Sequence, residues 1–275
     1  MEFLPYDRVH ATIDLDVLAE RATRFQPHFV YIDLSTSLTL PDVAGVRRAI
    51  GADPLLCFDA SHVLGLLPGC YDLAKFWHHV DVCTASTHKT FPGPQKAVVL
   101  ADRTEPAGLI GGRLAFRVSS GHSNSVAALG VTLAELAPAK RAYARSVVVN
   151  ARALASALAD RGLDVPGKDF GYTQTHQVWA APPFGVDPLD WGDRLLKAGI
   201  RATVVNLPTH ARPGLRIGAQ ELTRIGMRPH HMDAVAELLA TVLDSASDPA
   251  ALRERTAALA AAFPEAQTDF ADPGY

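Results

Sequence analysis

Short apolar runs alternate with helical patterns through the first hundred residues, and this alternation constrains the fold more than any other feature. Runs suited to β-strands occupy residues 29–35, 55–59, 80–85 and 97–101. Apolar residues at helical spacing occupy residues 13–21, 41–50 and 71–77. Strands that alternate with helices predict parallel β-α-β units whose sheet is covered by helices on both faces. We therefore expect an α/β fold with a mostly parallel sheet.

The second half of the chain has a different pattern. Residues 105–125 look irregular, and residues 126–162 are Ala-rich with helical spacing. Beyond them, strands are expected at residues 177–180, 201–205 and 215–217, and helices at residues 189–198, 231–245 and 250–263. We expect four regions along the chain: the C-terminal part of a large domain over 1–125, a connecting helical region over 126–162, a small α+β domain over 163–263, and a tail over 264–275.

Composition excludes several classes of function. The formal net charge is −3 over 275 residues, and no basic run is present, which argues against a nucleic-acid surface. No apolar run is long enough to span a bilayer, and the acidic start lacks the pattern of a signal peptide, so we expect a cytoplasmic protein. The three cysteines, Cys57, Cys70 and Cys83, have no paired spacing and are expected to be buried free thiols.

Two histidine pairs could suggest a metal site. His78-His79 follows a predicted helix, and His230-His231 precedes another, so both pairs are better explained as solvated or capping side chains. We expect no metal.

A lysine in an unusual setting lies at residues 86–95, Ser-Thr-His-Lys-Thr-Phe-Pro-Gly-Pro-Gln. Lys89 directly follows a predicted strand and precedes a turn-forming Pro-Gly-Pro. A rigidly held, partly desolvated amine is suited to Schiff-base chemistry, because only the neutral amine attacks a carbonyl carbon. A solvated loop lysine is the alternative, and this stretch alone does not decide between them.

Neighbouring strand ends carry further polar residues of suitable chemistry. Ser35, Asp59 and Lys89 all follow predicted strands, and reactive groups of parallel sheets gather at the carboxyl edge. An acid beside such a lysine could keep the ring nitrogen of pyridoxal 5'-phosphate (PLP) protonated, while the lysine forms the internal aldimine. His62, three residues after Asp59, would then lie near the ring.

Three separated motifs resemble the serine hydroxymethyltransferase family, whose members have the fold-type I PLP architecture. Residues 59–66, Asp-Ala-Ser-His-Val-Leu-Gly-Leu, resemble the family's Asp-x-Ala-His-x-x-Gly-Leu segment with Ser61 in place of alanine. Residues 86–90, Ser-Thr-His-Lys-Thr, resemble its Thr-Thr-His-Lys-Thr lysine motif. Residues 214–226 resemble its Gly-Ile-Arg-Ile-Gly-Thr run and the Thr-Arg-Arg-Gly that follows. The resemblance extends from residue 4 to about residue 263.

The resemblance implies a role for each matching residue. Lys89 would form the aldimine with PLP, Asp59 would pair with the pyridinium nitrogen, and His62 would contact the ring. Ser35, Ser86 and His88 would bind the cofactor, with His88 also close to the chemistry. Arg216 would clamp the substrate α-carboxylate, a task for which a planar guanidinium is suited. His176 is expected to be structural.

The start of the chain departs from the family pattern. In the family a long segment precedes the position of Met1 and carries the phosphate cup, the group that stacks on the ring, and substrate contacts. Without these parts, the sheet would expose a broad edge and an apolar face. We therefore expect this chain to be the C-terminal half of a split enzyme, completed by a separately encoded N-terminal half in a heterotetramer-like assembly.

Differences after the lysine motif bear on the substrate. Residues 94–97, Pro-Gln-Lys-Ala, replace the family's Pro-Arg-Gly-Gly, and the loop over residues 206–213 is shorter than the loop that contacts folate in the family. Residues 116–122 also replace a glycine-rich segment that reaches the phosphate of the neighbouring subunit. These departures favour an aldehyde acceptor, as in threonine transaldolase-like members, over a folate.

Three classes of function remain open from the sequence. The first is aldol-type transfer on glycine or a β-hydroxy-α-amino acid. The second is another PLP reaction at the α-carbon, such as transamination, decarboxylation or racemisation, because fold and lysine do not decide which bond breaks. The third is a non-catalytic subunit that stabilises a full-length homologue.

Overall fold

The computed structural model describes residues 1–101, 104–114, 116–210, 212–244, 246–270 and 273. The chain divides into two compact units, and each is described by itself. Unit 1 comprises residues 1–7, 12–35 and 40–144, and unit 2 comprises residues 8–11, 36–39 and 145–275. Within the described part of the chain, no helix is long and apolar enough to cross a membrane.

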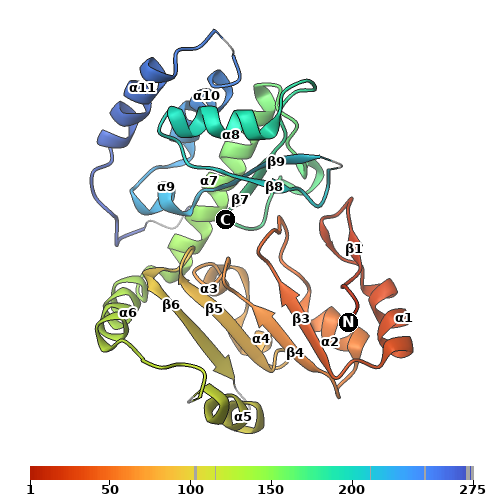
Figure 1. Ribbon diagram of the computed structural model, residues 1–275. Coiled ribbons are helices and arrows are strands. Elements are labelled where there is room, and N and C mark those ends of the chain that lie inside the picture. Colours follow the sequence, from red (N-terminus) through yellow and green to blue (C-terminus); the bar gives the residue numbers. More distant parts are fainter. Residues whose placement is uncertain (102–103, 115, 211, 245, 271–272, 274–275) are drawn as a thin grey trace. The chain divides into compact units, whose positions relative to one another are not determined.

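A four-stranded sheet organises unit 1 (Figure 1). Its strands are β3 (Phe29–Asp33), β4 (Leu55–Asp59), β5 (Val82–His88) and β6 (Pro92–Ala101), in the spatial order β3-β4-β5-β6. The pairs β3–β4 and β4–β5 are parallel, whereas β5 and β6 are antiparallel. The predicted α/β class with a mostly parallel sheet is thus confirmed for this unit.

The last strand of this sheet corrects one expectation. The apolar run at residues 97–101 belongs to a ten-residue strand that begins at Pro92. Only three residues separate it from β5, which is too short for the crossover that a parallel partner requires. The Pro-Gly-Pro segment therefore lies in a hairpin strand, and Lys89 lies in the turn of that hairpin.

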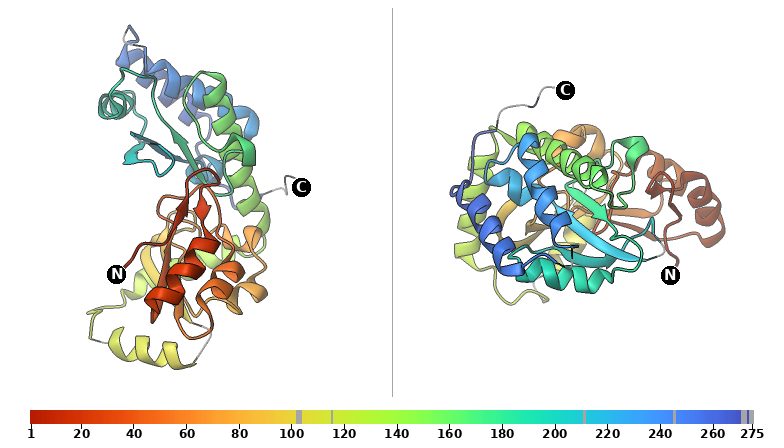
Figure 2. Two further views of the ribbon diagram at one scale, coloured as in Figure 1. Left: turned by 90° about the vertical axis from the view of Figure 1, so that its right-hand side faces the viewer. Right: turned by 90° about the horizontal axis from the view of Figure 1, so that it is seen from above.

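Helices and a small ribbon complete unit 1. They are α1 (Leu15–Phe25), α2 (Val43–Ile50), α3 (Leu67–Cys70), α4 (Leu73–Trp77), α5 (Thr104–Leu114), α6 (Ser123–Leu136), the first part of α7 (Lys140–Asp160), and the pair β1 (Tyr6–Asp7) and β2 (Thr12–Ile13). Helices α1 and α2 pack together (Figure 2). Asp14 caps α1, since its carboxylate accepts a 3.0 Å hydrogen bond from Val17 N. Helix α5 contradicts the irregular structure expected for residues 105–125.

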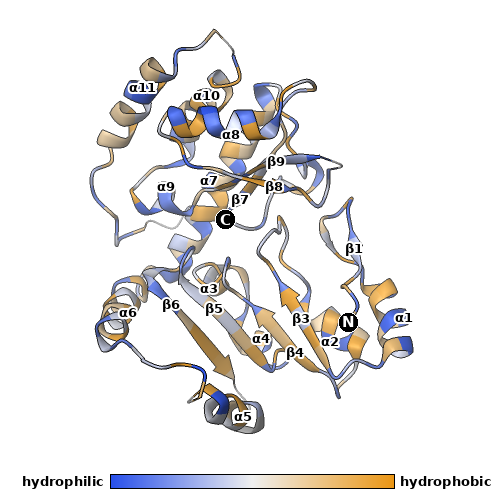
Figure 3. Ribbon diagram, in the orientation of Figure 1, coloured by the Kyte–Doolittle hydropathy of each residue, from blue (hydrophilic) through white to orange (hydrophobic). Residues whose placement is uncertain are grey.

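The sheet is covered unevenly. Val30 and Ile32 of β3 are buried, while Phe29 and Tyr31 on the opposite face are 52% and 42% exposed. The buried side is filled by aromatic packing, with the rings of Phe58 and Phe76 edge to face at 5.1 Å. Figure 3 shows β3, β4 and the second half of β6 as hydrophobic, whereas β5 is paler. The expectation of helices covering both faces is therefore not met at β3, where the side chains of Phe29 and Tyr31 remain about half exposed.

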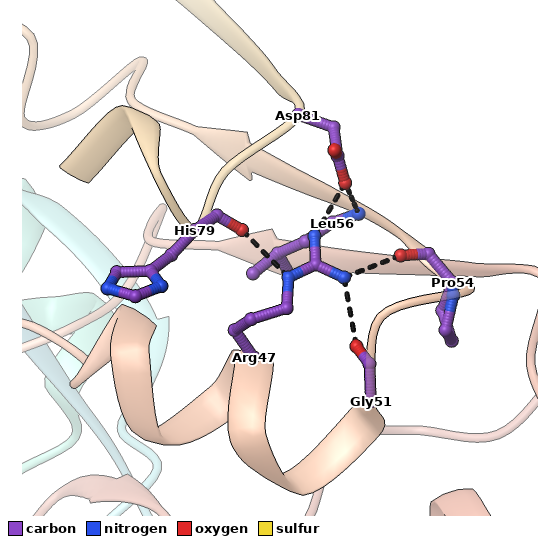
Figure 4. Close-up of polar contacts among 6 residues, drawn as sticks. All are labelled: Arg47, Gly51, Pro54, Leu56, His79 and Asp81. Carbon is purple, nitrogen blue, oxygen red and sulfur yellow. Dashed lines mark hydrogen bonds and ion pairs between the residues drawn. The ribbon is translucent and has the colours of Figure 1, made fainter. Parts of the chain in front are cut away.

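A buried ion pair joins helix α2 to the sheet (Figure 4). Arg47 Nη2 lies 2.5 Å from Asp81 Oδ2, and the same carboxylate oxygen accepts a 2.8 Å hydrogen bond from Leu56 N. The guanidinium also donates to the carbonyl oxygens of His79, Gly51 and Pro54 at 3.0, 3.1 and 2.7 Å. Both charged groups therefore have several hydrogen-bond partners, which offsets part of the cost of removing both charges from water.

Unit 2 is an α+β layer around a three-stranded antiparallel sheet. The strands β7 (Gln177–Ala180), β8 (Thr203–Asn206) and β9 (Pro213–Gly218) lie in the order β7-β9-β8. Around them lie the rest of α7, η1 (Lys168–Phe170), α8 (Pro188–Lys197), α9 (Gln220–Arg224), η2 (Pro229–His231), α10 (Met232–Thr241) and α11 (Pro249–Ala261). The core includes the fully buried Trp191 of α8 and Leu154 of α7.

Two short segments from the start of the chain belong to unit 2. The Thr173 hydroxyl donates a 3.1 Å hydrogen bond to Leu38 O, and the Thr39 hydroxyl donates to Ala11 O. Ala11 and Leu38 also share a small apolar cluster with the buried Trp179. Residues 8–11 and 36–39 are thereby anchored to the small sheet rather than to the large one.

Sequence expectations for the remaining segments have mixed outcomes. His231 Nδ1 accepts a hydrogen bond from Arg228 N at 2.9 Å, so it caps η2 as expected. All three cysteines are free, and Cys70 is only partly buried. Among the described residues no group of His, Cys, Asp and Glu has a metal-binding arrangement. The expected tail over 264–275 lies partly outside the described residues, since 271–272 and 274–275 are not among them.

Candidate active site

Three parallel strands of unit 1 end at the same edge, and the candidate residues follow these ends. Asp33 of β3 lies opposite Asp59 of β4, and Asp59 lies opposite Thr84 of β5. Ser35 follows β3 by two residues, and Lys89 directly follows β5. The carboxyl edge therefore brings an acid, a hydroxyl group and an amine into one region, as parallel sheets do at their ligand sites.

The Asp59 carboxylate accepts a hydrogen bond on each oxygen. Ser61 N donates to Oδ1 at 2.8 Å, and the Tyr31 hydroxyl donates to Oδ2 at 2.5 Å. Partial burial raises the pKa of Asp59, but the hydrogen bonds from Ser61 and Tyr31 and the positive charge of Lys89 outweigh burial and bring the pKa below its ordinary value. Asp59 is therefore a stable anion that lies within the electrostatic reach of Lys89.

The turn that carries Lys89 is held by its neighbours. The Thr87 hydroxyl donates to Pro94 O across the hairpin at 2.7 Å. On the far side of Lys89, the buried Thr90 accepts a 3.2 Å hydrogen bond from Gly65 N on its hydroxyl. These hydrogen bonds hold the backbone on both sides of Lys89. The Lys89 side chain is half-buried, so its amine remains accessible to a ligand.

The other predicted residues of unit 1 lie around this turn. His62 is 9% exposed and belongs to the tight turn after β4, where Val63 N donates to Ala60 O at 2.8 Å. Ser86 N donates to the Ser61 hydroxyl at 3.0 Å, which ties the lysine strand to the turn after Asp59. His88 is exposed at the end of β5.

Ser35 adopts a local turn at the end of β3. Its backbone N donates to Asp33 Oδ1 at 2.7 Å, and its side chain is half-buried. A carboxylate that accepts from the amide two residues later is typical of a turn that ends a strand.

Two predicted residues belong to unit 2. Arg216 lies in the middle of β9, opposite Trp179 of β7 and Thr203 of β8. Its side chain is half-buried, and burial lowers its pKa from the ordinary value, although a guanidinium of this kind stays charged at neutral pH. His176 is 3% exposed and immediately precedes β7, and its carbonyl oxygen accepts a 3.0 Å hydrogen bond from Ala219 N. The setting of His176 agrees with a structural position.

Several residues that shape the site were missed by sequence reasoning. Tyr31 was included only as part of an apolar strand, and its contact with Asp59 follows from the strand register. Gly65 and Thr90 lie inside the quoted motifs without having been assigned a task. The hydroxyl of Tyr143, in α7, donates a hydrogen bond to Thr90 O in the lysine turn, and no local signal connects these two residues, which lie 53 positions apart.

Fold and site together define an α/β protein with a candidate active site at the carboxyl edge of a mostly parallel sheet. The model of the serine hydroxymethyltransferase family matches residues 1–239. The serine hydroxymethyltransferase of Methanopyrus kandleri is 34% identical over 283 aligned residues, covering 98% of this chain and 65% of that protein. That of Pyrococcus horikoshii is 35% identical, covering 91% of this chain and 62% of that protein.

A solved structure gives the same result. The L-threonine transaldolase from Pseudomonas fluorescens, in its internal aldimine state, superposes with a TM-score of 0.86 at 31% identity over 94% of this chain and 60% of that one. The chain belongs to the serine hydroxymethyltransferase family, as its motifs predicted. It spans about 60 to 65% of the length of these three relatives.

Proposed function

We propose that the chain is a subunit of a PLP-dependent enzyme that makes or breaks the Cα–Cβ bond of β-hydroxy-α-amino acids, with glycine and an aldehyde as the other reactants. The observation that carries this proposal is the placement of Asp59 at the end of β4 and of Lys89 directly after β5, at the same carboxyl edge of the sheet. The family relationship and the similarity to a threonine transaldolase structure support the same chemistry.

The donor set of unit 1 fits PLP. Lys89 offers a primary amine on a fixed turn for covalent attachment of the cofactor aldehyde. Asp59 offers a carboxylate that hydrogen bonds keep ionised, which is the form that pairs with a protonated ring nitrogen. When bound, PLP supplies an electron sink that accepts the electron pair left at the α-carbon after bond cleavage.

We assign the remaining candidate residues to binding and orienting the cofactor and the substrate. We assign Ser35, Ser86, His62 and His88 to cofactor contacts, with His62 and His88 as the groups that hold or move protons near Lys89. We assign Arg216 to the substrate α-carboxylate, because its guanidinium stays charged while half-buried and can offer two parallel N–H donors. A β-hydroxyl proton must leave when the Cα–Cβ bond breaks, and a neutral histidine is a suitable acceptor for it.

We also propose that the missing part of the family fold comes from a separately encoded N-terminal-half chain. The surface of unit 1 supports this. Helix α6 has a single charged residue, Glu135, yet Val126, Val131 and Leu133 are 51%, 59% and 53% exposed. A helix that is apolar on most sides is normally buried. An open apolar cavity of about 430 Å³ also runs along β3 beside Phe3 and Phe29.

In this proposal the two units correspond to the domains of the family. Residues 1–125 are the C-terminal part of the PLP-binding large domain, residues 126–162 form the connecting helical region, and residues 163–263 form the small domain. The partner chain supplies the phosphate cup and the ring-stacking group, in a heterotetramer-like assembly. The shortened loop over residues 206–213 favours an aldehyde acceptor over a folate.

Reconstitution tests the proposal. The chain is mixed with its N-terminal-half partner, PLP, glycine and an aldehyde, and the β-hydroxy-α-amino acid product is measured by mass spectrometry. We expect product with the unsubstituted chain and none with Lys89→Ala. Lys75→Ala is the control, since Lys75 lies in α4 with its side chain 80% exposed and forms an exposed ion pair with Asp72 at 3.7 Å. This control should keep its activity.

Other products point to other functions. A keto acid or carbon dioxide in place of the aldol product indicates a different reaction at the α-carbon. Full activity of the Lys89→Ala complex indicates a non-catalytic stabilising subunit. A stable monomer that binds PLP by itself contradicts the split assembly.

A further inference from the structure

The hydroxyl of Tyr31 is bonded to Asp59, the candidate cofactor acid. Its ring lies on the exposed face of β3 and stacks on Phe29, with ring centroids 6.1 Å apart. In the register of the sheet, Tyr31 lies opposite Cys57, and Asp59 lies two residues further along β4, on the same face. The long phenol side chain spans that step, so its hydroxyl donates to Asp59 Oδ2 at 2.5 Å.

The geometry leaves Asp59 with a fixed orientation. Ser61 N donates to Oδ1 and the Tyr31 hydroxyl donates to Oδ2, so one donor from each side holds the plane of the carboxylate. A carboxylate has about four acceptor positions, so two such bonds leave capacity for a further N–H donor. Hydrogen bonds to the charged form of an acid favour that form, and those to an anion are stronger than neutral ones.

We propose that Tyr31 is a positioning residue for the cofactor site, which orients the Asp59 carboxylate and keeps it ionised for the ring nitrogen of PLP. The identity of the cofactor in this inference rests on the proposed function. The hydrogen bond between Tyr31 and Asp59 does not depend on that proposal. Tyr31 acts only through Asp59 and does not touch the reacting atoms.

The surroundings of Asp59 show what else bears on its charge. The titratable groups near Asp59 are Tyr31, which bonds to it, Asp33 at the paired position of β3, and Cys83 and Lys89, which interact with its charge. The positive charge of Lys89 favours the ionised form of Asp59. When PLP uses the Lys89 amine for covalent attachment, the hydroxyl of Tyr31 remains as a donor that does not depend on the state of the lysine.

The test uses Tyr31→Phe, which removes one oxygen and keeps the ring. Carboxyl ¹³C NMR of the complete chain follows the titration of Asp59. Loss of a hydrogen bond to a charged group should raise the pKa of Asp59 by about one unit. Tyr71→Phe is the matched control, because the Tyr71 hydroxyl donates to Pro41 O at 2.9 Å and should leave the Asp59 titration unchanged.

A reciprocal measurement checks the same bond from the other side. Burial, followed by the hydrogen bond to Asp59, raises the pKa of Tyr31 to about 12. Asp59→Asn removes the negative charge and should therefore lower the pKa of the Tyr31 phenol. Ultraviolet absorbance measures this titration. In the assembled complex, Tyr31→Phe should also weaken PLP binding by about three- to tenfold, measured from its visible absorbance band.

The outcomes separate this inference from the proposed function. An unchanged Asp59 titration in Tyr31→Phe overturns the inference, even where the complex binds PLP. Unchanged PLP affinity together with a raised Asp59 pKa also overturns the positioning role. The absence of any PLP band in the unsubstituted complex overturns the proposed function instead, and the NMR titration still reports on the Tyr31–Asp59 bond.

Discussion

Tyr143 donates a 2.7 Å hydrogen bond to the carbonyl oxygen of Thr90, the residue that follows Lys89. Both residues are fully buried, and 53 positions separate them in the sequence. A buried carbonyl oxygen needs a hydrogen-bond donor, and Tyr143 of helix α7 supplies it to the lysine turn.

Tyr143→Phe tests this support. We expect a loss of about 1 kcal/mol in the free energy of unfolding, since the Thr90 carbonyl loses its buried partner. Amide hydrogen exchange should increase over residues 86–94 and stay unchanged in β3. Equal exchange in both segments would show that the bond does not hold the turn.

Gly65→Ala should displace the same turn from the other side. A Cβ at Gly65 would lie 2.6 Å from the carbonyl carbon of Thr90 and 2.8 Å from Phe91 N, which are backbone atoms that cannot rotate away. We expect a loss of about 2–4 kcal/mol, measured by urea unfolding. Gly130→Ala is the control, because it lies in α6 with open space around its Cβ position and should stabilise the helix by up to about 1 kcal/mol. A well-folded Gly65→Ala protein of unchanged stability would contradict the close packing.

Arg47→Met should cost about 3 kcal/mol of folding stability, because it leaves Asp81 as a buried charge without its partner. The side chains of Arg47 and Asp81 are only 16% and 6% exposed. Arg48→Met, on the same helix, breaks an exposed pair with Asp42 and should cost less than about 1 kcal/mol. Urea denaturation of both variants measures the difference, and similar values for the two would refute the structural importance of the buried pair.

The buried cysteines should be chemically inert. Burial, followed by the charge of Asp81, raises the pKa of Cys57 to about 11, and burial raises that of Cys83 to about 12. Only the thiolate reacts, so a maleimide at pH 7 to 8 should label the partly buried Cys70 first, and the other two only after unfolding. Mass spectrometry of labelled peptides checks the order. Rapid labelling of Cys57 in the folded protein would be inconsistent with its burial.

The same shifts have a consequence for stability at alkaline pH. A thiol with a raised pKa keeps its proton in the folded state, while the unfolded thiol ionises near pH 9. Ionisation therefore favours the unfolded chain, and stability should fall as the pH rises from about 9 to about 11. The fall should become smaller in Cys57→Ala, which removes one of the two groups.

Local patterns were sufficient for much of the fold. The strands Leu55–Asp59 and Gln177–Ala180 have the bounds that the sequence predicted, since both are short apolar runs with clear ends. Helix α5 was missed because Gly108, Gly111 and Gly112 are poor helix formers that mask its pattern. Strand β6 was cut short because its Pro-Gly-Pro start is typical of loops, whereas tertiary pairing with β5 makes it a strand.

Local sequence patterns likewise indicated only some of the residues at the candidate site. Lys89, Asp59 and His62 could be named as candidates because short motifs of consecutive residues contain them. Tyr31 and Tyr143 could not, because their contacts depend on strand register and on a helix distant in sequence. Side chains that act through long-range packing leave no local signature.

The hairpin of β5 and β6 also has a consequence for folding kinetics. Pairings of β3 with β4, and of β4 with β5, join residues about 25 positions apart, whereas the hairpin joins His88 to Pro92. Short loops close fastest and with the smallest entropic penalty, and hairpins form within microseconds. We therefore expect the lysine turn to be among the first native elements of the large sheet, available as a template on which the slower parallel pairings assemble.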